Sequence, residues 1–177
     1  MQISEAISLI QSGIPTEKSG VWADFGAGTG IFTQALQHML PAASTIYALD
    51  KSPLLLYQIP QQTDQKLVVV EGDFTRSMDL PMLDGIILAN ALHYASDHLS
   101  TLQNILNYLY DRGTLILVEY EQETPRPPWV PFPVSFRRLQ GLASELGLEA
   151  PQKLHQMPSV YGYEMIYSAK LTRKQNL

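Results

Sequence analysis

Residues 21–32 constrain the fold of this chain more than any other segment. They spell VWADFGAGTGIF, in which a short apolar run leads into Asp24 and glycines follow at 26, 28 and 30. Glycine adopts positive φ without strain and has no side chain, so a ligand can approach the backbone closely. A dinucleotide fingerprint, G-x-G-x-x-G, would need glycine at position 31, where Ile31 stands instead. The segment predicts a strand, a tight turn and a helix, with a backbone open to a ligand.

The rest of the chain alternates β-rich runs with helical patterns. We expect strands at 21–25, 45–49, 67–70, 85–89 and 114–118. The run at 67–70 is continuously apolar, which is typical of a strand buried on both faces. Two extended segments near 150–157 and 163–171 have no helix between them. They are expected to pair antiparallel, with Gly162 near their turn.

Three helices are expected between and after these strands. One spans 31–40, and another places leucines on one face at Leu99, Leu102, Leu106 and Leu109. The third carries Phe136, Leu139, Ala143 and Leu146 inward and ends at Gly147. This alternation predicts an α/β fold with a mostly parallel sheet and helices on both faces.

A length of 177 residues fits one domain, 1–177. We divide it into an N-terminal helix within 1–20, a ligand-binding core at 21–120, and a proline loop, helix and hairpin at 121–177. In such sheets the ligand lies beyond the carboxyl ends of the strands. Polar residues follow four of the predicted strands there, and begin at Asp24, Asp50, Asp73 and Asn90.

The pattern D-x-G-x-G-x-G at 24–30 resembles motif I of the class I S-adenosylmethionine-dependent methyltransferases. The resemblance implies a Rossmann-like seven-stranded sheet of order 3-2-1-4-5-7-6 with strand 7 antiparallel. It also implies which residues hold S-adenosylmethionine: the methionine part lies at Asp24, Phe25, Gly26, Ala27, Gly28 and Gly30, the ribose at Asp50, Lys51 and Ser52, the adenine at Asp73 and Phe74, and the methyl group beside Asn90. Taken singly, each of these segments also fits a structural turn.

The segment after the fourth strand bears on the methyl acceptor. Methyltransferases that act on amino groups of DNA bases carry Asn/Asp-Pro-Pro-aromatic here, whereas this chain has Ala91 and Leu92 after Asn90. The segment is more similar to small-molecule enzymes of the ubiquinone and trans-aconitate type. His93 is the candidate base by its position, because histidine is the side chain most often used as a general base. It is equally a histidine that packs against or caps the next helix.

Four further residues are candidates for contact with the acceptor: Tyr94, Glu119, Tyr120 and Trp129. The proline-rich loop at 122–134 carries Trp129 and Phe132, of which we expect one ring to be buried and one to lie near the site; alternatively, both fill the core. About twenty residues precede the first strand, which is room for one helix and not for a larger lid. The acceptor side is therefore expected to be open, with weak discrimination or a closing partner.

Composition excludes several other classes of protein. Twelve basic against seventeen acidic residues give a net charge of −5, which argues against a nucleic-acid partner. The absence of cysteine rules out disulfides, thiolate nucleophiles and cysteine-bound zinc, and we expect no metal. No apolar run approaches membrane-spanning length, so we expect a cytoplasmic monomer or homodimer. The favoured function is methyl transfer from S-adenosylmethionine to a small molecule; the alternative is a non-catalytic binding or partner subunit.

Overall fold

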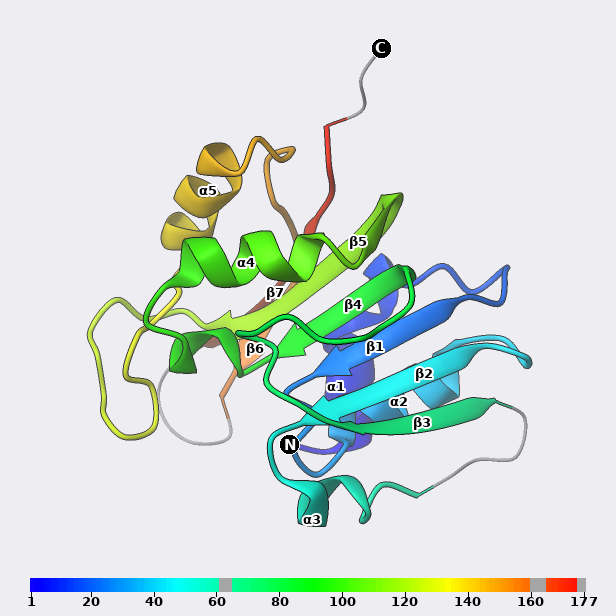
Figure 1. Ribbon diagram of the computed structural model, residues 1–177. Helices are drawn as coiled ribbons and strands as arrows, with labels where there is room; N and C mark the ends of the chain where they lie inside the picture. Colours follow the sequence, from blue (N-terminus) through cyan, green and yellow to red (C-terminus); the bar gives the residue numbers. More distant parts are fainter. Residues whose placement is uncertain (61–64, 160–164, 175–177) are drawn as a thin grey trace.

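A seven-stranded sheet forms the centre of the computed structural model, which describes residues 1–60, 65–159 and 165–174 (Figure 1). Its strands are β1 (Val21–Phe25), β2 (Thr45–Asp50), β3 (Lys66–Glu71), β4 (Leu83–Ala89), β5 (Leu109–Tyr120), β6 (Gln152–Pro158) and β7 (Met165–Leu171). They lie in the order β3-β2-β1-β4-β5-β7-β6. The first five pair in parallel, and β7 is antiparallel to both β5 and β6. The predicted Rossmann-like sheet is confirmed, and Gly162 lies outside the described residues.

Helices cover both faces of this sheet (Figure 1). They are α1 (Ile3–Ile10), α2 (Ile31–Met39), α3 (Pro53–Leu56), α4 (His98–Leu106) and α5 (Phe136–Glu145), with short 3₁₀ turns η1 (Gln11–Gly13) and η2 (Leu92–Tyr94). On β4, Ile86 and Leu88 pack in the apolar layer under α4 and α5, whereas Ile87 packs in the layer under α1 and α2. Because both faces of β4 are buried from Gly85 to Ala89, this part of its sequence carries no polar side chain.

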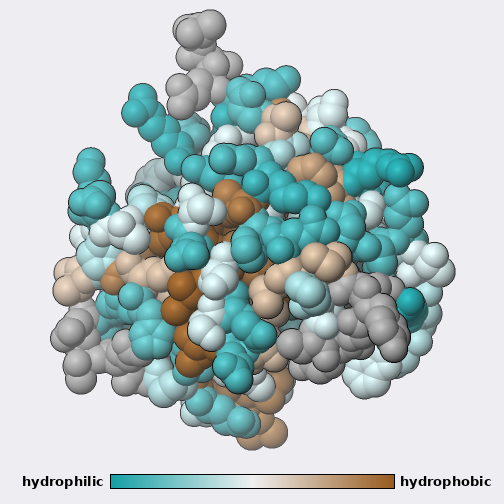
Figure 2. All heavy atoms as spheres, turned by 180° about the vertical axis from the view of Figure 1, so that it is seen from behind, coloured by the Kyte–Doolittle hydropathy of each residue, from teal (hydrophilic) through white to brown (hydrophobic). Residues whose placement is uncertain are grey.

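The first helix is tied to the last strand of the chain. The hydroxyl of Ser168 on β7 donates a hydrogen bond to the main-chain oxygen of Leu9 on α1, and α1 also contacts α2 and β6. Figure 2 shows the molecule from behind, where a narrow band of hydrophobic atoms lies within a largely hydrophilic face. In the described part of the chain, no helix combines the length and apolar character needed to cross a bilayer.

The prediction that 67–70 is buried on both faces was wrong. In the structure β3 is an edge strand that pairs only with β2, and the side chain of Val69 is 37% exposed. The physical reason is that the segment from β3 to β4, residues 72–82, forms no helix to cover that edge. A run of valines packs equally well on a half-covered strand, so composition does not distinguish an edge position from a central one.

The helix predicted to include Leu109 ends earlier. It begins at His98, where the Asp97 side chain accepts a hydrogen bond from the Ser100 N–H at 3.0 Å, and it ends at Leu106. Leu109 instead opens β5, which is longer than the predicted 114–118. Its side chain is nevertheless buried in the same apolar layer as those of α4, so the helical spacing was coincidental. The predicted stop of α5 at Gly147 is confirmed by a φ of 67°.

Candidate cofactor and acceptor site

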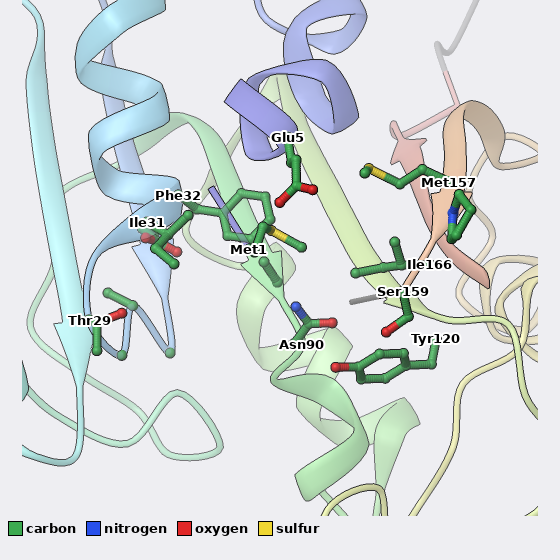
Figure 3. Close-up of a pocket in the computed structure, with 16 residues that line it drawn as sticks. Met1, Glu5, Thr29, Ile31, Phe32, Asn90, Tyr120, Met157, Ser159 and Ile166 are labelled. Carbon is green, nitrogen blue, oxygen red and sulfur yellow. The ribbon is translucent and has the colours of Figure 1, made fainter. Parts of the chain in front are cut away.

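A cavity of about 240 Å³ opens at the carboxyl ends of β1 and β4 (Figure 3). One wall is the glycine loop after β1, and another is formed by Asn90 and Tyr120 at the ends of β4 and β5. The remaining walls come from the N-terminal segment that includes α1, from the start of α2, from the end of β6 and from β7. The cavity therefore lies at the edge of the sheet where ligands bind in open α/β folds.

The glycine loop combines two different requirements for glycine. A Cβ atom on Gly30, whose φ is 80°, would lie 2.3 Å from the Cγ1 atom of Ile59, so this position has no room for a side chain. A Cβ atom on Gly28, whose φ is 54°, would meet nothing within 4 Å. Gly30 is therefore needed for packing, while Gly28 leaves its backbone open to a ligand.

Asp24 is a buried carboxylate that lines the cavity. Its side chain is 1% exposed, and its Oδ2 atom accepts a hydrogen bond from the Thr33 hydroxyl at 2.7 Å. Burial raises the pKa of Asp24 to about 6, although the Thr33 hydrogen bonds act in the opposite direction. Among the described residues no Lys, Arg or His side chain forms an ion pair with it. Asp24 is thus a buried acid suited to a cationic ligand group.

Asp50 holds the glycine loop to the end of β2. Its Oδ2 atom accepts the Gly28 N–H at 2.8 Å, and its Oδ1 atom accepts the Ser52 N–H at 3.0 Å. Each carboxylate oxygen can accept a second hydrogen bond, so Asp50 can still bind a hydroxyl pair. Its side chain is half-buried and lies outside the lining of the cavity in Figure 3. The predicted ribose contact remains a prediction.

The predicted adenine residues are engaged within the protein. The Oδ1 atom of Asp73 accepts hydrogen bonds from the Thr75 N–H and hydroxyl, at 2.9 and 2.6 Å, and its Oδ2 atom lies 3.1 Å from the Lys51 ammonium. Burial acts to raise the pKa of Asp73, but the Thr75 hydrogen bonds and Lys51 hold it below its ordinary value. Phe74 is buried in the core near Gly26. Neither Asp73 nor Phe74 lines the cavity.

Asn90 presents an unsatisfied oxygen at the cavity. It adopts a left-handed conformation, with φ of 50°, and its N–H donates to the Val118 carbonyl at 2.8 Å. Within the described structure, its buried Oδ1 atom has no hydrogen-bond partner. A buried acceptor left unpaired costs about 1–3 kcal/mol, so a ligand that donates to this oxygen would be favoured.

His93 and Glu119 form a buried pair beside the cavity. The Nδ1 atom of His93 lies 2.7 Å from the Oε2 atom of Glu119, and the His93 N–H donates to the Oε1 atom at 3.2 Å. Glu119 therefore binds both the ring and the main chain of His93, which joins η2 to β5. The His93 ring also contacts the rings of Tyr94 and Tyr120, with centroids 4.3 and 5.9 Å away. Of these four residues, only Tyr120 lines the cavity.

The proline loop is attached through its main chain and not through its rings. Trp129 is 75% exposed and Phe132 is 42% exposed, so the prediction that one ring is buried was wrong. The Phe132 N–H donates to the His93 carbonyl at 3.0 Å, and the Nε2 atom of His98 lies 3.2 Å from the Phe132 oxygen. Because these contacts hold the loop, its aromatic side chains need no buried position. Tyr94 is also exposed.

Several residues of the cavity were not predicted from the sequence. They come from the N-terminal segment that includes α1 and from the last two strands with the residue after β6, and they are Met1, Glu5, Met157, Ser159 and Ile166. The spacing of Ile3, Ile7 and Ile10 predicted a helix but gave no sign of where that helix packs. The only local signal is one acidic residue, Glu5, in an otherwise apolar and small-residue helix.

The profile of the methyltransferase domain family matches residues 23–115, which is more than half of the chain. The chain therefore belongs to this family, and its sheet and glycine loop place it among the class I S-adenosylmethionine-dependent methyltransferases. No curated protein sequence is significantly similar to it.

Solved structures share the fold at low sequence identity. CalO1, a methyltransferase of calicheamicin biosynthesis solved with S-adenosylhomocysteine, is 20% identical with a TM-score of 0.68 over 97% of this chain and 54% of its own. YcgJ from Bacillus subtilis is 14% identical, with a TM-score of 0.68, and the match covers 97% of this chain and 100% of YcgJ. The Burkholderia thailandensis 1,6-didemethyltoxoflavin N1-methyltransferase is 16% identical, with a TM-score of 0.69, and the match covers 96% of this chain and 78% of that enzyme. The chain thus spans about half the length of CalO1 and all of YcgJ.

The cavity residues fit S-adenosylmethionine at three points. Asp24 is a buried acid without a cationic partner in the described structure, which suits the ammonium of the methionine part. Gly28 faces open space, and Asn90 offers an unpaired oxygen. Among the described residues, no group of three or more His, Cys, Asp or Glu side chains is arranged to hold a metal ion.

Proposed function

We propose that this chain transfers a methyl group from S-adenosylmethionine to a small-molecule acceptor by in-line displacement. The observation that carries the proposal is the position of Asp24, a buried acid on the wall of a cavity beside the open backbone of Gly28. Bound S-adenosylmethionine supplies a methyl group on a positively charged sulfur, which becomes neutral as the methyl leaves.

The protein residues hold the reactants in position. Asp24 pairs with the methionine ammonium, Asp50 accepts the ribose hydroxyls, and Asn90 lies on the methyl side of the cavity. Alignment of two bound reactants is worth about 7–11 kcal/mol of the barrier, which accounts for much of the rate without a covalent intermediate. We assign the buried His93–Glu119 pair to positioning, because it anchors η2 and contacts the ring of Tyr120.

Three observations support a small molecule as the acceptor. The cavity is small, at about 240 Å³, and apolar side chains contribute to its lining, among them Phe32, Met157 and Ile166. The net charge of −5 disfavours a nucleic-acid substrate. CalO1 and the didemethyltoxoflavin enzyme are named for small molecules, and both share this fold.

Isothermal titration with S-adenosylmethionine and S-adenosylhomocysteine tests the proposal. We expect both to bind the unmodified chain, and Asp50→Ala to weaken binding at least about tenfold, since it removes a charge-assisted acceptor. Asp79→Asn, at an exposed acid remote from the cavity lining, is the control for loss of one charge. Failure of both ligands to bind would refute the proposal. Binding with no turnover on any acceptor would instead favour a non-catalytic subunit.

A further inference from the structure

We propose that Glu5 selects an acceptor that carries a basic nitrogen group, and thereby sets the substrate class. This inference rests on the proposed function, since it concerns the acceptor side of the same cavity. It concerns recognition of the acceptor only: the nitrogen that pairs with Glu5 need not be the atom that receives the methyl group.

Glu5 enters the cavity from an element that contributes nothing to the glycine loop. It lies in the first turn of α1, is half-buried and lines the cavity. Figure 3 shows its carboxylate pointing from α1 into the space between Phe32 and Ile166, with Asn90 on the far side. The acidic group thus faces the part of the cavity left for an acceptor.

Helix capping alone does not account for the charge at this position. The Oε2 atom of Glu5 accepts the Gln2 N–H at 2.6 Å, which satisfies one unpaired donor at the start of α1. A glutamine side chain can make the same hydrogen bond, so the cap requires an oxygen and not a negative charge. The second carboxylate oxygen of Glu5 is not needed for the cap.

The charged side chains that line the cavity determine which charge on the acceptor is favoured. Its acidic side chains are Glu5 and Asp24, and no Lys, Arg or His side chain lines it among the described residues. An anionic acceptor would be repelled by the carboxylates of Glu5 and Asp24, and no cationic side chain of the lining offsets this repulsion. Charges also interact more strongly away from bulk water. Asp24 is assigned to the cofactor ammonium, which leaves Glu5 to bind a cation on the acceptor. The apolar side chains of Met1, Phe32, Met157 and Ile166 suit an apolar body on that acceptor.

Three phenols that differ in charge test this assignment: tyramine, which is cationic, p-cresol, which is neutral, and 4-hydroxyphenylacetate, which is anionic. Their binding to the chain saturated with S-adenosylhomocysteine is measured by titration. We expect tyramine to bind most tightly and 4-hydroxyphenylacetate least. In Glu5→Gln, we expect tyramine to lose about tenfold in affinity while p-cresol is unchanged, because only the charge is removed. Glu17→Gln, at an exposed position, is the matched control and should leave all three affinities unchanged.

A charge reversal strengthens the test. Glu5→Lys should invert the order, so that 4-hydroxyphenylacetate binds more tightly than tyramine. Retained binding of S-adenosylhomocysteine shows that each variant is folded. The inference is overturned if the unmodified chain binds the three probes equally or not at all, or if Glu5→Gln keeps the preference for tyramine. Failure of S-adenosylhomocysteine to bind the unmodified chain would instead overturn the proposed function.

Discussion

Replacement of Asp24 by asparagine should stabilise the ligand-free protein and abolish its function. Asparagine has nearly the same shape as aspartate, and its oxygen can still accept the hydrogen bond from the Thr33 hydroxyl. The substitution therefore removes the buried negative charge with little change in packing. It also removes the group that we propose pairs with the methionine ammonium.

The expected gain in the free energy of unfolding follows from the pKa of Asp24. Burial raises it from 3.8 to about 6, so the folded state binds a proton more tightly than the unfolded state. A group with a raised pKa contributes stability that is complete below pH 3.8 and is lost as the pH rises through about 6. One pKa unit corresponds to about 1.4 kcal/mol. At pH 8 the charged Asp24 carboxylate therefore lowers the free energy of unfolding by about 3 kcal/mol, whereas at pH 4 it lowers it by less than about 1 kcal/mol.

Urea unfolding at several pH values between 4 and 8 measures this difference. The free energy of unfolding of Asp24→Asn should exceed that of the unmodified protein by about 3 kcal/mol at pH 8, and the excess should shrink toward pH 4. Asp79→Asn, at an exposed site, should show no such pH-dependent gain. A difference that does not vary with pH, or a less stable Asp24→Asn protein at pH 8, would refute the reasoning. S-adenosylhomocysteine should bind Asp24→Asn at least about tenfold more weakly.

Two further substitutions test the packing around the site. Gly30→Ala should destabilise the protein by about 1–3 kcal/mol, measured as a lower Tm, because the new Cβ would clash with Ile59 and the φ of 80° is unfavourable for alanine. Gly141→Ala in α5, where a Cβ meets nothing within 4 Å, should instead raise the Tm. Glu119→Ala should lower the free energy of unfolding in urea by about 3–5 kcal/mol, because it leaves the buried His93 ring without its carboxylate partner. An effect no larger than that of Glu123→Ala, which removes an exposed ion pair, would contradict this prediction.

The sequence pattern was sufficient to predict a mostly parallel sheet and the positions of the polar residues that follow its strands, while the strand order was implied by the resemblance to class I methyltransferases. Alternating strands and helices leave few topologies open, and polar residues directly after buried strands fall at one edge of the sheet. Asp24 and Asn90 were found in this way, and both line the cavity.

What escaped prediction depends on contacts between distant segments. The spacing of isoleucines in α1 indicates a helix, but only tertiary packing turns Glu5 toward the cavity. A run of valines such as that in β3 occurs whether or not a helix covers the strand, so the exposure of Val69 could not be predicted from the sequence. Leu109 fits a helical period by coincidence, because burial in one apolar layer does not reveal which element supplies the side chain.

The hydrogen bond between Ser168 and Leu9 has a consequence for the timing of folding. These residues are 159 positions apart, so α1 leaves the ribosome long before β7 exists to receive it. At about 5–20 residues per second, the delay is on the order of 10–30 s. During that interval α1 can already pack against α2, but its contacts with β6 and β7 cannot yet form. The cavity wall that contains Met157 and Ile166 can therefore form only after β6 and β7 have been synthesised.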